Sequence, residues 1–283
     1  MLNTNYEICG ITFGFQAQQS LSHGSQSVLF EKSGNNVDVS VNISAVPSIE
    51  KNTAKTQGRA GEKLVWCDDS VVFRMTHDRF RKEPHIMVSY NEKDISHITC
   101  TVRNTDWLWA TRDQYLWSGI ALNMILLYFK TLLFHASYIG YNNAGIIFTA
   151  PSGTGKSTQA ELWRRHRGAK ILNGDKVGIS LRDKPMAHGV PFSGTSGICE
   201  NRSLPLKAVV ILSQAPENII RKMAPVEAVT ALCPNVFVDK LVSKEWSIAL
   251  NLLLDLVSQV PVYSLACTPD ERAIEALESV LSL

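Results

Sequence analysis

The 283-residue chain lacks several features that mark whole classes of proteins. Its six cysteines are scattered singly without a C-x-x-C pair, which predicts free thiols in a reducing cytoplasm rather than a zinc site or a disulfide framework. Lys and Arg number 28 against 26 acidic residues, a net charge of +2, so we expect neither a nucleic-acid partner nor an anionic membrane surface. No basic stretch followed by an apolar block opens the sequence, so we expect no secretion signal.

The sequence also lacks a long hydrophobic run. The best candidate for a membrane span, residues 120–134, is short and contains Asn123 and Lys130, so it predicts a buried helix instead. Apolar residues at helical spacing extend across 111–130 and predict a helix there. With 45% hydrophobic residues, the chain can bury a substantial core in one large or two medium domains.

The character of the sequence changes near residue 105. Residues 1–105 contain short alternating runs such as VDVSVNIS, SVVFRM and HITCTV, separated by turn clusters and by the loop EKNTAKTQGRAGE. This pattern predicts a β-rich N-terminal domain, built as an antiparallel sheet or partial barrel. Its charged residues, including Arg79 and Arg81, are interpreted as solvated strand faces and loops. Residues 106–283 form the second predicted domain, which gives an α/β or α+β fold overall.

The segment Ala150 to Ser157 reads APSGTGKS, between the apolar run GIIFT and the helix-forming segment TQAELWRRHRG. A strand, a glycine loop, Lys-Ser and a helix together predict a phosphate-binding loop, although Ala150 replaces the usual first glycine. A glycine-rich turn alone would leave the Lys-Ser pair unexplained. The predicted binding residues for ATP are Ser152, Gly153, Thr154, Gly155, Lys156, Ser157 and Thr158. Lys156 would reach the outer phosphates and Ser157 would bind Mg²⁺.

The preceding segment predicts a hairpin. LLFHASYIG and AGIIFTA flank Asn142 and Asn143, which tolerate the positive φ that a two-residue turn requires. Paired positions then sum to 285, which places His135 opposite Ala150 at the start of the loop. A strand histidine is also often an ordinary core residue, and a register slip of one would turn it to the other face. Both interpretations of His135 remain open.

The helix after the loop is predicted to end at Gly168, and the short strand AKILNGD follows it. In a strand–helix–strand unit, the second strand ends at the same sheet edge as the loop, which places Asp175 near the metal and the terminal phosphate. A carboxylate there can hold Mg²⁺ or accept a proton from a hydroxyl. The alternative is a turn aspartate beside a glycine.

These features resemble the HPr kinase/phosphorylase family, whose nucleotide site is similar to that of ATP-dependent phosphoenolpyruvate carboxykinase. The resemblance covers about residues 132–283. It depends on His135-Ala136, the loop APSGTGKS, Gly174-Asp175, Gly197-Ile198 with Arg202-Ser203, KAVVILSQ, and PVYSLACTPDERAIEAL. It implies a P-loop kinase domain of the HPr-kinase/carboxykinase type with catalytic Asp175, His135 and Lys156, and Arg202 as a clamp on the transferred group, with a surface arginine as the alternative. A homo-oligomer is also implied.

The chain departs from that family in two places. The family's signature Glu has no match, since Phe192 and Ser193 stand near its position, and only one acid of an Asp-Asp pair is present. The segment near the position of that Glu reads PFSGTSG, and its residues Ser193 to Gly197 could wrap a substrate or form a flexible turn. The chain is more similar to stand-alone HPr-kinase-like proteins that phosphorylate a serine in a peptide or a small acceptor.

Three functions follow as hypotheses. The first is an ATP- and Mg²⁺-dependent cytoplasmic kinase that phosphorylates a hydroxyl of a peptide, protein or small molecule. The second is a nucleotide-binding regulatory module with weak chemistry, since Asp175 lacks its partner acid. The third is a carboxykinase-type enzyme, for which Arg103 and Arg112 are present without a matching motif.

Overall fold

The computed structural model of the chain describes residues 2–22, 24–50, 58–60, 62–78, 80 and 82–281. Contacts divide it into two compact units, which are described separately below. One unit comprises Met1–Tyr128 with Asp239–Trp246, and the other comprises Phe129–Val238 with Ser247–Leu283. The sequence-based boundary at residue 105 stays a prediction. Residues Arg79 and Arg81 and most of the loop EKNTAKTQGRAGE lie outside the described residues.

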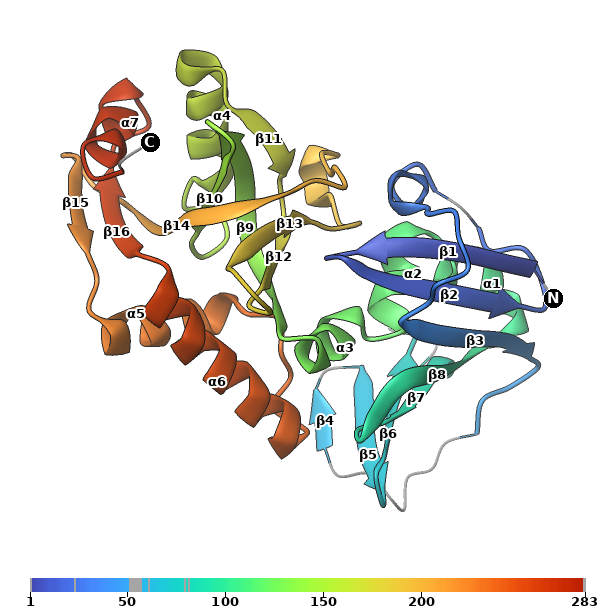
Figure 1. Cartoon of the computed structure of the whole chain (residues 1–283). Helices are drawn as coiled ribbons and strands as arrows, with labels where there is room; N and C mark the ends of the chain where they lie inside the picture. Colours follow the sequence, from blue (N-terminus) through green and yellow to red (C-terminus); the bar gives the residue numbers. More distant parts are fainter. Residues whose placement is uncertain are drawn as a thin grey trace. The chain divides into compact units, whose positions relative to one another are not determined.

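The N-terminal unit contains a curved eight-stranded sheet in its described part, in the order β1-β2-β3-β8-β7-β6-β5-β4 (Figure 1). The strands are β1 (Leu2–Ile8), β2 (Ile11–Ala17), β3 (Val39–Val46), β4 (Gly58–Ala60), β5 (Lys63–Asp68), β6 (Val71–His77), β7 (Pro84–Asn91) and β8 (Asp94–Arg103). The expected antiparallel sheet is wrong in part, because β3 pairs parallel with both β2 and β8. The long connection between β2 and β3 permits this crossover, and alternating polarity in a sequence does not report strand direction.

The predicted helix over 111–130 is interrupted in the structure. It is replaced by α2 (Asp113–Gly119) and α3 (Leu122–Tyr128), which follow the short helix α1 (Trp107–Ala110). Ala121 and Lys130 have positive φ values of 57° and 49°, which a continuous α-helix does not permit. The apolar stretch 120–134 is therefore buried as expected, but as part of α3 and the start of a strand rather than one helix.

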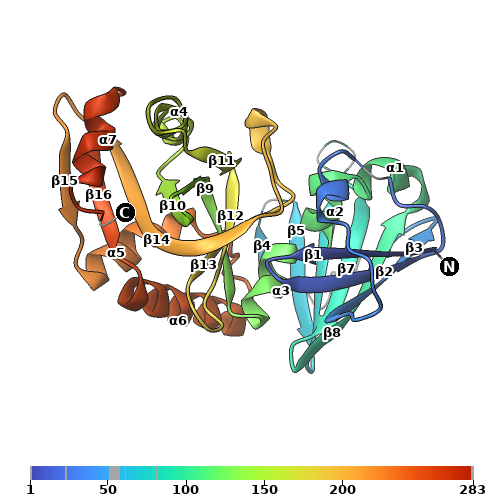
Figure 2. The same ribbon diagram turned by 45° about the horizontal axis from the view of Figure 1, so that its top comes forward.

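Helix α2 lies over the sheet of this unit (Figure 2), and aromatic side chains pack between them. The fully buried ring of Trp117 contacts Tyr6 edge-on at 5.2 Å and Phe15 at 5.6 Å. Such edge-to-face pairs stabilise a core by about 0.5–1.5 kcal/mol each beyond their buried area.

Among the helices of the described residues, none combines the length and the apolar composition that a membrane span requires.

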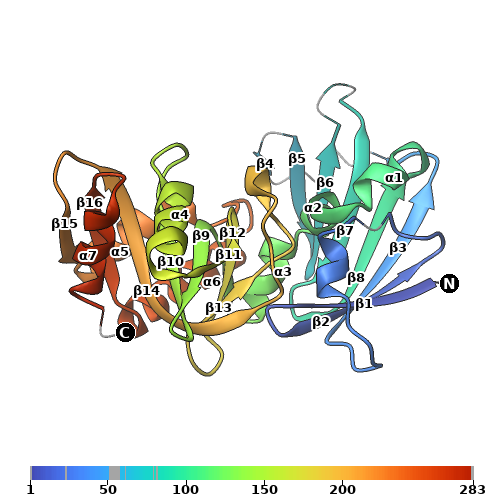
Figure 3. The ribbon, with the colours of Figure 1, turned by 90° about the horizontal axis from the view of Figure 1, so that it is seen from above.

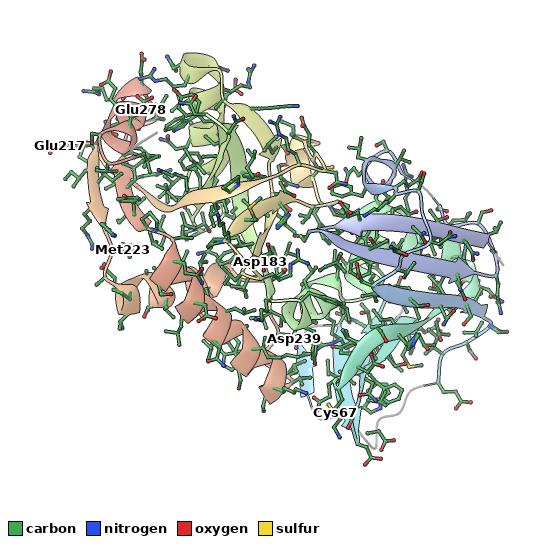
Figure 4. The ribbon with its side chains drawn as sticks, in the orientation of Figure 1. Cys67, Asp183, Glu217, Met223, Asp239 and Glu278 are labelled. Atoms are coloured by element: carbon green, nitrogen blue, oxygen red, sulfur yellow. The ribbon has the colours of Figure 1, made fainter. Side chains whose placement is uncertain are left out.

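A buried ionic cluster joins the segment 239–246 to this unit. The Arg74 guanidinium donates to Glu245, which is fully buried, and to Asp239, which lies just before helix α6 (Ser243–Gln259) (Figure 4). Tyr90 donates to the same Glu245 carboxylate. Because the Arg74 guanidinium and the Glu245 carboxylate are both buried, each depends on the other to offset the cost of desolvation.

The second unit contains the loop predicted to bind phosphate. Its strands are β9 (Thr131–Tyr141), β10 (Ala144–Thr149), β11 (Lys170–Asn173), β12 (Lys176–Ser180), β13 (Met186–Gly189), β14 (Ser203–Gln214), β15 (Ile219–Lys222) and β16 (Val262–Cys267). Its helices are α4 (Lys156–Arg167), α5 (Pro225–Leu232), α6 (Ser243–Gln259), whose first residues belong to the N-terminal unit, and α7 (Glu271–Glu278). Short 3-10 turns occur in this unit at η4 (Gly194–Ser196) and η5 (Cys233–Asn235), and in the N-terminal unit at η1 (Ser27–Phe30) and η3 (Asn104–Asp106).

The sheet of this unit is mixed. Strands β10, β14 and β16 lie side by side and parallel, while β9 runs antiparallel to β10 and pairs on its other side with β11 and β12. Helices α4 and α7 cover one face of the sheet and α6 lies on the other (Figure 3). Arg167 at the end of α4 donates two hydrogen bonds to Glu278 of α7, which joins the two helices (Figure 4).

Candidate functional site

The site begins with a strand, a loop and a helix. β10 ends at Thr149 and α4 begins at Lys156, which confirms the elements predicted on either side of the glycine loop, Ala150 to Gly155. Gly153 and Gly155 have φ values of +80° and +120°, which only glycine adopts readily. No side chain of the described residues caps the start of α4 at Gly155, so the first N–H groups of the helix are available to an anion.

The hairpin before the loop has the predicted register. Asn142 and Asn143 have φ values of 47° and 58°, and the residue numbers of each pair between β9 and β10 sum to 285, from Ala144–Tyr141 to Thr149–Ala136. The Thr149 hydroxyl donates to the carbonyl of His135 at 2.9 Å. His135 is therefore fixed beside the point where the chain leaves β10 for the glycine loop.

Asp175 lies near the start of the glycine loop as well, but it comes from the other side of β9. The turn between β11 and β12 carries it, and the Ala136 N–H donates to the Asp175 carbonyl at 3.0 Å. The Asn173 side chain, fully buried, accepts from the N–H groups of Asp175 and Lys176 and donates to the Val190 carbonyl. This Asx turn sets the direction of the backbone that presents the carboxylate.

Three titratable groups meet where these segments converge. His135 Nε2 lies 3.8 Å from Asp175 Oδ1. The Lys156 ammonium is 8% exposed and donates to the carbonyls of Ala150 and Pro151 at 3.0 and 3.3 Å. Burial lowers the pKa of Lys156, and the negative charge of Asp175 partly offsets this. Burial and the charge of Lys156 lower the pKa of His135, so its imidazole is neutral near pH 7 and can accept a proton.

A second loop closes over Asp175. It contains the turn η4 (Gly194–Ser196), and Gly194 has a φ of +54°. A Cβ added to Gly194 would lie 2.7 Å from Cβ and Cγ of Asp175, and one added to Gly174 would lie 2.1 Å from Ser196 Oγ. Both glycines therefore permit a close approach that a larger residue would prevent. The segment proposed to wrap a substrate or to form a turn thus packs directly on the carboxylate.

Together these segments enclose a cavity of about 310 Å³, referred to below as the phosphate cavity. It is lined by His135, Ser152, Gly153, Gly155, Lys156, Ser157, Thr158, Gly174, Asp175 and Thr195. The structure thus brings together the predicted residues of the glycine loop with His135 and Asp175. Thr154 lines an adjoining cavity instead.

Arg202 does not join this group. It lines a separate cavity with Asn142 and Asn143, at the turn where β10 begins, whereas the phosphate cavity lies where β10 ends. The clamp role expected for Arg202 from the resemblance therefore has no support in the geometry of this chain. The segment before β14 lies near the start of β10 because the two strands are parallel and Leu206 pairs with Gly145. The clamp role of Arg202 stays a prediction.

The lining of the phosphate cavity fits a chain of phosphates with Mg²⁺. Within the described residues, no group of three or more His, Cys, Asp or Glu side chains could hold a metal ion. Ser157 and Asp175 offer two oxygen ligands, which is the sparse protein ligation typical of Mg²⁺ when phosphate oxygens and water complete the shell. Backbone N–H groups and Lys156 on the same cavity suit the phosphates.

The sequence alone did not single out several residues at this site. Asn173 could have been noticed from the Asn-Gly-Asp run, which is typical of an Asx turn. Lys176 lies with its ammonium 4.0 Å from the ring centre of Phe192 and 4.8 Å from that of Phe237, and the Phe237 ring lies 6.1 Å from His135. Phe237 is distant in the sequence, and no local pattern predicts that it packs here.

Comparison with known proteins gives a limited result. None of the curated proteins matches this chain significantly. Among solved structures, that of the Hpr(Ser) kinase/phosphatase from Coxiella burnetii is similar to this chain with a TM-score of 0.32 and 11% sequence identity, over 52% of this chain and 87% of the other. A family model described as SynChlorMet cassette protein ScmC matches residues 116–282, more than half of the sequence. The chain therefore belongs to the ScmC family of SynChlorMet cassette proteins.

Proposed function

We propose that this protein is an ATP- and Mg²⁺-dependent kinase that transfers the γ-phosphate to a hydroxyl, with a serine of a peptide or protein as the expected acceptor. The observation that carries the proposal is the meeting of Lys156, Asp175 and His135 on the cavity formed by the glycine loop. The glycine loop acts as a P-loop in this account. We place the reaction in the cytoplasm and expect a homo-oligomer.

The phosphates are held by charge and by backbone groups. N–H groups of the glycine loop and of the first turn of α4 bind phosphate oxygens, and the positive end of the helix dipole favours their charge. Lys156 neutralises the β- and γ-phosphates from its buried position at the start of α4. Ser157 and Asp175 would hold Mg²⁺, which would further neutralise the charge that develops during transfer.

Asp175 and His135 handle the proton. Asp175 orients the acceptor hydroxyl and takes its proton, and the neutral His135 imidazole, 3.8 Å away, receives that proton from the carboxylate. The acceptor oxygen forms a bond to the γ-phosphorus as the bond from that phosphorus to the β–γ bridging oxygen breaks, so that ADP leaves. Positioning and electrostatic stabilisation supply most of the rate in such transfers.

The two alternative functions make different use of the same residues. A regulatory module would bind nucleotide in the phosphate cavity without turnover. A carboxykinase would need arginines for an organic acid, yet the guanidinium of Arg103 donates to Asp106 and Glu83 within the N-terminal unit. We therefore carry only the kinase forward.

Incubation with [γ-³²P]ATP, Mg²⁺ and a library of serine-containing peptides tests the proposal. Asp175→Asn, which keeps the shape of the side chain, should reduce phosphate transfer by about 10²–10⁴-fold while ATP still binds. Lys156→Ala should lose both ATP affinity and transfer. Normal transfer by Asp175→Asn would refute the role of the carboxylate, and ATP binding without transfer to any hydroxyl would favour the regulatory module.

A further inference from the structure

A second cavity, of about 430 Å³, adjoins the phosphate cavity on the far side of the glycine loop from Asp175. The two share Gly153, Gly155 and Thr158. It is lined by Gly153, Thr154, Gly155, Thr158, Gln159, Leu212, Gln214, Ala215, Cys267, Thr268 and Pro269. Its walls come from the carboxyl ends of β14 and β16, which run parallel to β10. The carboxyl edge of parallel strands is where α/β sheets bind ligands.

Gln159 is the unusual residue of this cavity. Its side chain is 2% exposed, and its Nε2 donates to Cys267 Sγ at 3.3 Å. Its Oε1 has no hydrogen-bond partner among the described residues. A buried acceptor without a partner is costly, and a ligand N–H would relieve that cost. Helix α4, which presents Lys156 to the phosphates, thus presents an unpaired amide oxygen one turn later.

The opposite wall of the cavity is fixed before any ligand arrives. Thr268 accepts at its hydroxyl from Asn218 Nδ2 at 2.8 Å, its N–H donates to Asn218 Oδ1, and its own hydroxyl donates to Asp270. Gln214, the last residue of β14, lies with its Nε2 3.5 Å from the carbonyl of Thr154. Apolar Leu212 and Pro269 complete a surface suited to a flat ring with polar edges.

A third cavity, of about 520 Å³, is lined in part by Ser157 and Thr158 and is the alternative place for the nucleoside. The carboxylate that lines it is already paired, because Glu161 accepts from Arg164 and from Arg165. Gly174 and Ser196 also line this third cavity, so it lies on the same side of the glycine loop as Asp175. The terminal phosphate belongs at that end in the proposed function, so the nucleoside belongs at the other.

We infer that the cavity beside Gln159 is an adenine subsite, in which Gln159 Oε1 accepts a hydrogen bond from the exocyclic amino group of the base. This inference rests on the proposed function, because it assigns the nucleoside of the same ATP. Adenine carries an N–H donor at position 6, where guanine carries an oxygen acceptor. Two facing acceptors repel, so the subsite selects ATP over GTP.

Calorimetry with ATP, GTP and inorganic tripolyphosphate, each with Mg²⁺, tests the inference. The wild-type protein should bind ATP at least about 10-fold more tightly than GTP, the factor that one good hydrogen bond of about 1.4 kcal/mol supplies. Gln159→Met, similar in size but without the amide, should bring ATP and GTP within about 2-fold of each other. Unchanged tripolyphosphate affinity in that variant would show that it is folded with an intact phosphate cavity.

Ile198→Ala, on the third cavity, is the matched control and should keep the preference for ATP. Loss of the preference in Ile198→Ala rather than in Gln159→Met would move the base to that cavity and overturn the inference. Equal affinity for ATP and tripolyphosphate, or a preference for GTP, would also overturn it while leaving the phosphate cavity intact. Failure of all three probes to bind would instead refute the proposed function.

Discussion

The contact between Gly194 and Asp175 gives the sharpest prediction for catalysis. Gly194→Ala would add a Cβ 2.7 Å from Cβ and Cγ of Asp175, and this contact must open by about 0.7 Å to reach ordinary van der Waals separation at 3.4 Å. The loop and the carboxylate would share that displacement. A misplacement of about 1 Å of a reacting group costs about 10²-fold in rate, so we expect turnover to fall by 10- to 100-fold.

Gly197→Ala is the matched control for this change. Gly197 has a φ of +69°, close to the +54° of Gly194, but an added Cβ there would meet nothing within 4 Å. Both variants therefore share a backbone penalty of about 1–2 kcal/mol for a left-handed alanine, and only Gly194→Ala displaces Asp175.

The assay is steady-state phosphate transfer from labelled ATP, with ATP affinity measured by calorimetry and stability by thermal unfolding. We expect a lower kcat in Gly194→Ala, ATP affinity within about 3-fold of wild type, and similar Tm shifts in the two variants. Wild-type turnover in Gly194→Ala, or an equal loss in Gly197→Ala, would refute the idea that this loop sets the position of the carboxylate.

Three further predictions concern stability and positioning. Burial lowers the pKa of His188 to about 4, so the imidazole stays neutral in the folded protein while the unfolded chain protonates it below about pH 6.5. The stability of the protein should therefore fall by about 3 kcal/mol as the pH drops from about 6.5 to about 4. In urea unfolding across this range, His188→Gln should lack that dependence on pH. Arg74→Met should destabilise the protein by about 3–5 kcal/mol because it leaves buried Glu245 unpaired, and Arg74→Met with Glu245→Leu should recover most of this loss in denaturant melts; no recovery would mean that the charges are not coupled. Asn173→Ala removes three hydrogen bonds, so we expect a loss of about 2–3 kcal/mol and a lower kcat, whereas wild-type kcat would show that the Asx turn does not position Asp175.

Local signals in the sequence predicted the core of the site. The Asn142–Asn143 pair determines a two-residue turn, and the turn determines the register that places His135 beside the glycine loop. Gly168, in the left-handed region at φ +66°, ends α4 as predicted. The strand that follows lies beside β9 and antiparallel to it, hence parallel to β10, and this brings Asp175 to the same edge.

Long-range features could not be predicted in the same way. The parallel pairing of β3 with β2 and β8 depends on how a long connection crosses the sheet, which alternating polarity does not report. Phe237 reaches Lys176 only through the folding of a segment about sixty residues away. The position of Arg202 near the start of β10 likewise depends on the pairing of β14 with β10, which a short motif does not report.

Titration of Mg·ATP into the wild-type protein and into Lys156→Ala, followed by calorimetry, tests the central claim most directly because it requires no knowledge of the acceptor. We expect saturable heat for the wild type and its loss in Lys156→Ala, because this substitution removes the ammonium that lines the phosphate cavity. Absence of heat from the wild type with any nucleoside triphosphate, or equal binding by the two proteins, would contradict it.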